Sequence, residues 1–107
     1  MSITGELKQN GEQFEGYIAD LLFDADIALR PNQRKDNDAQ PDFLVFAKSP
    51  RGRDIPVGAA WGFNTSQAGN QFLSLTVSIG SVDTRVNAVG QADNVSHLRI
   101  IPFASNG

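Results

Sequence analysis

An all-β fold is predicted by two features of this 107-residue chain. Apolar and polar residues alternate in several short runs, as they do in strands that bury one face. Residues that favour turns separate these runs at spacings of roughly 8 to 12 residues. About seven or eight short strands result, which predicts a small antiparallel sandwich or a partly open barrel. The chain is 40% hydrophobic and long enough for one core, so we expect a single domain over residues 1–103 and a frayed tail over 104–107.

The first strand is predicted in residues 3–9, where Ile3, Gly5 and Leu7 alternate with polar residues, and Asn10-Gly11 is a strong hairpin signal. The next segment, residues 13–23, has two interpretations. Its apolar residues recur at helical spacing, but Phe14, Gly16 and Ile18 also alternate as in a strand. We favour the strand because glycine weakens a helix, and the helix stays open as the alternative.

Alternation resumes over residues 24–30 and stops at Pro31, which cannot donate a ladder hydrogen bond. Residues 32–42 are polar and lack a period, so we expect a loop. The unbroken apolar run FLVFA at 43–47 predicts a strand buried on both faces. Residues 49–56 (SPRGRDIP) then form a turn.

Residues 57–79 read as a long hairpin that holds the only tryptophan. Its first strand places four apolar side chains on one face, and its second alternates apolar residues toward the core; these are Val57, Ala59, Trp61 and Phe63, then Leu73, Leu75, Val77 and Ile79. Between them lies a polar loop, 64–70, where Gly69 is the expected site of a positive φ angle. A weakly alternating strand over 82–88 and a last strand over 95–103, with Leu98 and Ile100 inward, complete the prediction.

Composition excludes several functions. The absence of cysteine removes disulfides, thiolate metal sites and thiol nucleophiles. The opening residues lack the pattern of a secretory signal, and no apolar run is long enough to span a membrane, so we expect a cytoplasmic protein with no membrane partner. The net charge of −3 does not favour long-range attraction to nucleic acid.

No pattern in the chain predicts catalysis. The only histidine, His97, lies on a predicted strand, and no serine sits in a nucleophile elbow. The acidic residues Asp24, Asp26, Asp36, Asp38 and Asp42 do not have the spacing of an EF-hand loop. No phosphate-binding glycine motif occurs. We therefore expect no catalytic residue, no metal site and no cofactor.

Aromatic and basic residues around two turns are the binding candidates: Trp61, Phe63, Phe72, Lys48, Arg51 and Arg53. If the strands on either side of residues 49–56 pair, these groups could share a rim and hold a single-stranded nucleic acid by stacking. The competing interpretation, which we favour for Trp61 and Phe63, is that they are core residues on the face of Val57. Phe72 is the better exposed candidate, since it opposes the apolar face of its strand.

Four segments together resemble the DUF736 proteins, a family of small domains of unknown function: MSITGELKQNGEQFEGYI at the start, PDFLVF at 41–46, VGAAW at 57–61 and TSQAGNQFLSLTV at 65–77. The family pattern runs MSxIGxF, then PDYRVF, then GAAWKKTSxxGxxYLSVxLDDP. The resemblance covers most of the chain in order and implies an association with plasmids and integrative elements of proteobacteria. It implies no mechanism.

Departures from the family pattern change the expected ligand. Gly62 and Phe63 stand where the family usually has two lysines, which removes two possible phosphate contacts. Phenylalanine replaces tyrosine at Phe43 and Phe72. We therefore expect a non-enzymatic accessory protein of a mobile genetic element that binds a protein partner or forms a homodimer, through an edge strand or the Trp61–Phe72 hairpin. Weak single-stranded nucleic-acid binding is the alternative, and a hydrolase using His97 comes third.

Overall fold

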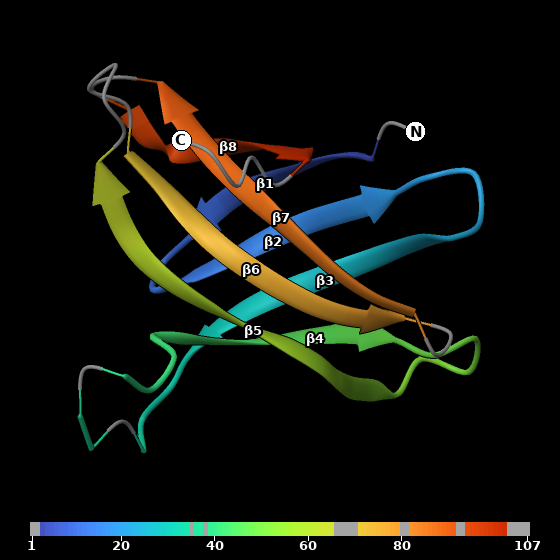
Figure 1. Ribbon diagram of the computed structural model, residues 1–107. Coiled ribbons are helices and arrows are strands. Elements are labelled where there is room, and N and C mark those ends of the chain that lie inside the picture. The colour runs from blue at the N-terminus through green and yellow to red at the C-terminus, as the bar shows by residue number, and fades with distance from the viewer. Residues whose placement is uncertain are drawn as a thin grey trace.

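The computed structural model describes residues 3–34, 36–37, 39–65, 71–79, 82–91 and 94–102. Eight antiparallel strands form a closed barrel (Figure 1). In chain order they are β1 (Thr4–Asn10), β2 (Gln13–Ala19), β3 (Asp24–Pro31), β4 (Phe43–Lys48), β5 (Asp54–Thr65), β6 (Gln71–Ile79), β7 (Val82–Gln91) and β8 (Asn94–Pro102). The all-β prediction is confirmed, and the sheet closes on itself instead of staying partly open. The predicted tail, 104–107, lies outside the described residues.

Each strand pairs with the next one along the chain, and β8 returns to pair with β1. Every described strand therefore has a hydrogen-bonded neighbour on both sides. The expectation that a partner docks on an edge strand is wrong for this barrel, because closure removes the edges.

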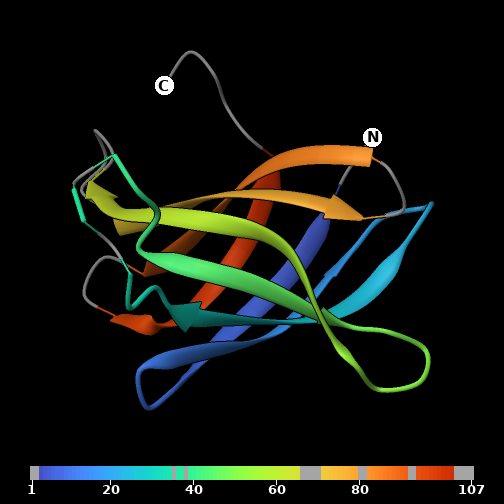
Figure 2. The same cartoon turned by 90° about the horizontal axis from the view of Figure 1, so that it is seen from below.

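The barrel has two ends, which we name after the glycines in their turns. The Gly11 end carries the β1–β2 turn and residues 32–42, and the Gly52 end carries the β2–β3 and β4–β5 turns (left and right in Figure 1). Gly11 has φ 66° and Gly52 has φ 82°, and residues other than glycine rarely adopt such positive φ angles. The Asn10-Gly11 signal therefore located the first hairpin correctly. Figure 2 shows β4 and β5 running side by side to the turn at Gly52.

The inward side chains of all eight strands fill the barrel. Buried residues alternate with more exposed ones along the strands. This agrees with the inward positions predicted for Leu7 in β1, for Leu73, Leu75 and Val77 in β6, and for Leu98 and Ile100 in β8. The buried core consists of Leu7, Phe14, Ile18, Ile27, Leu29, Val45, Ala47, Ala60, Leu73, Leu75, Val77, Val86, Ala88, Leu98 and Ile100. Eight strands enclose a space that side chains can fill, so the interior is a core. Binding functions are left to the outer surface and the two ends.

The first seven of residues 13–23 form strand β2, which confirms the strand interpretation over the helix. Gly16 pairs with Leu7 of β1, and a Cβ atom at Gly16 would lie 1.7 Å from the carbonyl oxygen of Glu6. The glycine that argued against a helix is therefore needed for the close approach of two strands. Leu21 and Leu22, which the helical alternative placed on an apolar stripe, lie exposed in the β2–β3 turn.

A β-bulge reverses the predicted faces of β5. Phe46 pairs with Pro56 and Val45 pairs with Gly58, which leaves Val57 as an extra residue. After the bulge Gly58 and Ala60 face the interior, so Trp61 faces outward. The prediction that Trp61 is a core residue is wrong, because one inserted residue moves every following side chain to the other face. The side chain of Phe63 and residue Gly69 lie outside the described part of the chain.

Strand β4 is buried on one face only. Val45 and Ala47 point into the core, whereas Leu44 and Phe46 point outward and are half-buried. The prediction of a strand buried on both faces is therefore wrong, because the outer face is only half-buried. The apolar outer face of β4 is the floor of a surface groove.

Candidate functional site

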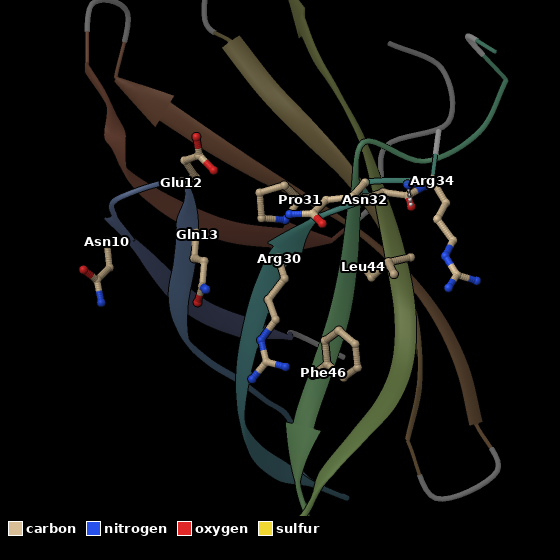
Figure 3. A pocket seen from close by; sticks show the side chains of 10 residues that line it. Asn10, Glu12, Gln13, Arg30, Pro31, Asn32, Arg34, Leu44 and Phe46 are labelled. Carbon is tan, nitrogen blue, oxygen red and sulfur yellow. Dashed lines mark hydrogen bonds between the residues drawn. The ribbon is translucent and has the colours of Figure 1, made fainter. Parts of the chain in front are cut away.

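A groove crosses the outer surface of β2, β3 and β4 (Figure 3). It consists of two hollows, of about 560 Å³ toward the Gly11 end and about 330 Å³ toward the Gly52 end. Gln13, Arg30 and Phe46 line both hollows, which makes them one continuous site. We refer to this site as the groove.

The floor of the groove is apolar. Leu44 and Phe46 project from β4, and Pro31 ends the neighbouring strand β3. The guanidinium carbon of Arg30 lies 4.7 Å from the centre of the Phe46 ring, which is the geometry of a cation–π contact. The positive charge of Arg30 therefore lies over one face of the Phe46 ring.

Asp54 holds Arg30 in place. Arg30 Nη2 donates to Asp54 Oδ2 at 2.9 Å, and Lys48 Nζ lies 2.6 Å from Asp54 Oδ1. Hydrogen bonds from Lys48 and then from Arg30 lower the pKa of Asp54 from its ordinary value. All three side chains are partly exposed, so this network contributes little to stability. Its effect is to fix the guanidinium over the Phe46 ring.

Charges of both signs form the walls at the Gly11 end. Glu12 and Arg34 lie on opposite sides of the floor, and both are exposed. Asn32 stands beside Arg34, but its amide is already engaged: Nδ2 donates to the Pro41 carbonyl at 2.9 Å, and Oδ1 accepts from the Arg34 amide at 3.1 Å. Asn32 therefore shapes the rim, and the exposed charged groups on either side are available to a ligand.

The two halves of the predicted aromatic and basic site lie at opposite ends of the barrel. Lys48, Arg51 and Arg53 are at the Gly52 end, whereas Trp61 and Phe72 lie toward the Gly11 end. β4 and β5 do pair across the turn, but Phe43 lies five residues, or roughly 17 Å, along β4 from Lys48. Trp61 lies one residue beyond Ala60, the partner of Phe43, and is therefore further still from Lys48. The prediction of a shared rim is therefore wrong. Arg51 and Arg53 are exposed, and Lys48 is paired with Asp54.

Trp61 holds the segment that joins β3 and β4. Its Nε1 donates to the Ala39 carbonyl at 3.1 Å, and the following amide, Gly62 N, donates to Asp42 Oδ2 at 2.9 Å. Another hollow, of about 340 Å³, lies beside the indole and is lined by Ser74, Leu75, Thr76 and Arg85 in addition to Trp61. Phe72 is half-buried and pairs with Val89 on the adjacent strand. The indole therefore has a structural role.

His97 lies apart from the acidic residues Asp24, Asp26 and Asp42, which belong to or follow other strands. His97 is half-exposed on β8, with Nε2 3.5 Å from Glu6 Oε2. Among the residues that the structure describes, no three acidic or histidine side chains are grouped closely enough to hold a metal ion. Nor does this part of the chain contain a helix long and apolar enough to cross a membrane.

The central residues of the groove were not among the binding candidates predicted from the sequence; they are Arg30, Leu44 and Phe46. The signal for Leu44 and Phe46 was present in the unbroken run FLVFA, because each strand of a closed barrel has one outward face. An apolar outward face predicts a covered or binding surface. What the pattern could not supply was Arg30, since the register between β3 and β4 brings it beside that run.

Comparison with known families agrees with the resemblance seen in the sequence. The family model described as "Protein of unknown function (DUF736)" matches residues 3–100, which include all of β1 to β7 and most of β8. Searches of curated proteins and of solved structures return no match. Since the match spans nearly the whole chain, this protein belongs to the DUF736 family.

Proposed function

We propose that this protein is a non-enzymatic protein-interaction module whose groove binds an extended segment of a protein partner. The observation that carries the proposal is the apolar floor of Leu44 and Phe46, flanked by exposed charges of both signs. The family resemblance implies an accessory role on a mobile genetic element, and a docking module without chemistry of its own suits such a role.

An extended peptide fits the chemistry of the groove. Its side chains alternate in direction, so an apolar side chain can pack on Phe46 while polar neighbours reach the walls. Arg34 and the remaining N–H groups of Arg30 favour a carboxylate, in the planar geometry that guanidinium groups recognise. The expected ligand is a short extended segment with apolar and acidic side chains.

Nucleic acid is the less supported ligand. Four carboxylates line the two hollows, those of Glu12, Glu15, Asp26 and Asp54, against the three cations of Arg30, Arg34 and Lys48. A polyanion that followed the whole groove would be repelled in the smaller hollow, which three of these carboxylates line. The separation of the basic turn from Trp61 also removes the stacking arrangement on which the nucleic-acid interpretation rested.

Selection from a displayed library of random peptides tests the proposal. Wild type and two variants, Phe46→Ala and the matched control Phe72→Ala, are immobilised and used to select binders. We expect wild type and Phe72→Ala to enrich the same apolar and acidic peptides, and Phe46→Ala to bind them at least about tenfold more weakly, because an aromatic contact is lost. Equal binding by Phe46→Ala would overturn the proposal. Binding of single-stranded DNA that weakens steeply with salt would favour the alternative.

A further inference from the structure

The β2–β3 turn presents two leucines to solvent. Leu21 is 90% exposed and Leu22 is 76% exposed. Asp20 Oδ1 accepts hydrogen bonds from the amides of Leu22, at 2.7 Å, and of Phe23, at 3.1 Å, and Asp20 N donates to the Phe23 carbonyl at 2.8 Å. Phe23 packs against the core. We call residues 20–23 the leucine turn.

This turn is ordered before it meets a partner. The aspartate cap fixes the backbone on one side and Phe23 fixes it on the other, so little conformational entropy remains to be lost when the leucines are covered. The other large apolar side chains that are exposed among the described residues, Tyr17 and Ile55, are 37% and 42% exposed. The leucine turn is therefore the most exposed apolar feature of the described surface, and it is preorganised.

The leucine turn and the larger hollow of the groove carry opposite charges, because Arg30 and Arg34 line that hollow against Glu12, whereas three of the four groove carboxylates line the smaller hollow. Asp24 directly follows the turn, and Asp26 is the next outward residue of β3; both are exposed. The groove offers an apolar floor with Arg34 exposed at its rim. An apolar pair flanked by carboxylates is the ligand chemistry that the groove was proposed to accept.

We infer that the partner of the groove is the leucine turn of a second copy of this chain, so that the protein forms a two-fold symmetric dimer. The inference rests on the proposed function of the groove. Each copy inserts Leu21 and Leu22 over Leu44 and Phe46 of the other, with Asp24 facing Arg34. The contact is made twice per dimer, as two-fold symmetry requires.

The position of the two surfaces supports this arrangement. The leucine turn joins β2 to β3 at the Gly52 end, and the larger hollow of the groove lies over β2, β3 and β4 toward the Gly11 end (Figures 1 and 3). Two copies packed face to face and antiparallel along these strands bring each turn over the other copy's groove. Tyr17 projects outward between the two surfaces, on the strand that the two-fold axis would cross.

Complementation between two variants tests the dimer. One variant, Leu21→Ser with Leu22→Ser, lacks the turn but keeps its groove, and the other, Phe46→Ala, lacks the groove floor but keeps its turn. Sedimentation velocity of wild type over a wide concentration range should show a monomer–dimer equilibrium. The turn variant should raise the concentration of half-dimerisation at least about 100-fold, since four leucines per dimer become polar. Ile55→Ser, which alters an exposed apolar residue at the same end, is the control and should dimerise like wild type.

A mixture of the two variants should recover dimers with one intact contact. A wild-type chain that stays monomeric, or a dimer that survives the turn substitution, would overturn the inference. Peptide selection on the turn variant separates this failure from failure of the proposed function, because its groove is intact and unoccupied. Enrichment of apolar and acidic peptides by a protein that does not dimerise would leave the groove with another partner. No enrichment and no dimer would reject both.

Discussion

The groove and the surface around Trp61, which we call the Trp61 face, contain similar residues that have different roles. Both place an aromatic ring near an arginine on the outer surface: Phe46 with Arg30 on β4 and β3, and Trp61 with Arg85 on β5 and β7. In the groove the arginine is held by Asp54 and the floor stays open to a ligand. On the other face the indole is tied to the backbone at Ala39.

The difference follows from the side chains themselves. Tryptophan carries an N–H group that needs an acceptor when the ring is half-buried, and the nearest acceptor belongs to the neighbouring segment of the chain. Phenylalanine has no such group, so the Phe46 ring contacts the Arg30 side chain but holds no backbone segment by a hydrogen bond. An outward tryptophan is therefore weak evidence for a binding site when its nitrogen is satisfied internally.

Glycines beneath the two faces should produce the largest effects. A Cβ atom at Gly16 would lie 1.7 Å from the Glu6 carbonyl oxygen, and one at Gly58 would lie 1.9 Å from that of Thr76. We expect Gly16→Ala and Gly58→Ala each to lower the free energy of unfolding by at least about 4 kcal/mol, because the backbone must move. Chemical denaturation followed by circular dichroism measures this loss.

Gly11→Ala is the matched control, since a Cβ atom there meets open space and only the φ of 66° is unfavourable. Its cost should be about 1 kcal/mol. If Gly16→Ala cost no more than Gly11→Ala, the close approach of β1 and β2 would be contradicted.

Substitutions of Trp61 and Phe46 should have different effects, the first on stability and the second on binding in the groove. Trp61→Phe removes the hydrogen bond to Ala39 and should lower the free energy of unfolding by about 1 kcal/mol. Amide exchange should quicken at Asn32, whose N–H donates to the Asp42 carbonyl within the held segment. Phe46→Leu, at a half-exposed outer position, should change stability by less than about 0.5 kcal/mol and weaken groove binding. A larger loss of stability from Phe46→Leu than from Trp61→Phe would contradict the different roles assigned to the two rings.

The Asp54 network predicts a pH dependence confined to acid. Its pKa is lowered in the folded protein, so the stabilisation is complete above the unfolded value, near 3.8, and is lost as the pH falls through the folded pKa. Wild type should exceed Asp54→Asn in stability by a small, constant margin from pH 5 to 8, and the margin should shrink below pH about 4. Urea titrations of both proteins across this range measure it. A margin that grows toward acid would contradict the assigned direction.

An exposed pair outside both faces should show the smallest effect. His97 and Glu6 are half-exposed and 3.5 Å apart, so His97→Ala should change the free energy of unfolding by less than about 0.5 kcal/mol. Thermal denaturation at pH 6 and pH 8 measures the change. A larger loss would assign His97 a role that its surroundings do not suggest.

Much of the fold could be predicted from the sequence because alternation and turn chemistry are local. The pattern at Leu7, Leu73, Leu75 and Leu98 located the inward faces, and Asn10-Gly11 located the first turn. The candidate site could not be predicted in the same way. Lys48 and Trp61 are 13 positions apart in the chain and belong to adjacent strands, yet they lie at opposite ends of the barrel.

By itself, the sequence determined the class of fold, most strand positions and the family, since each depends on local pattern or on matching residues in order. Tertiary structure alone decided which way Trp61 points, because a bulge at Val57 arises from pairing with β4 and leaves no local signal. It also decided the site. Arg30, Phe46 and Asp54 meet only through the registers of three strands, and those registers are set when the sheet closes around its core.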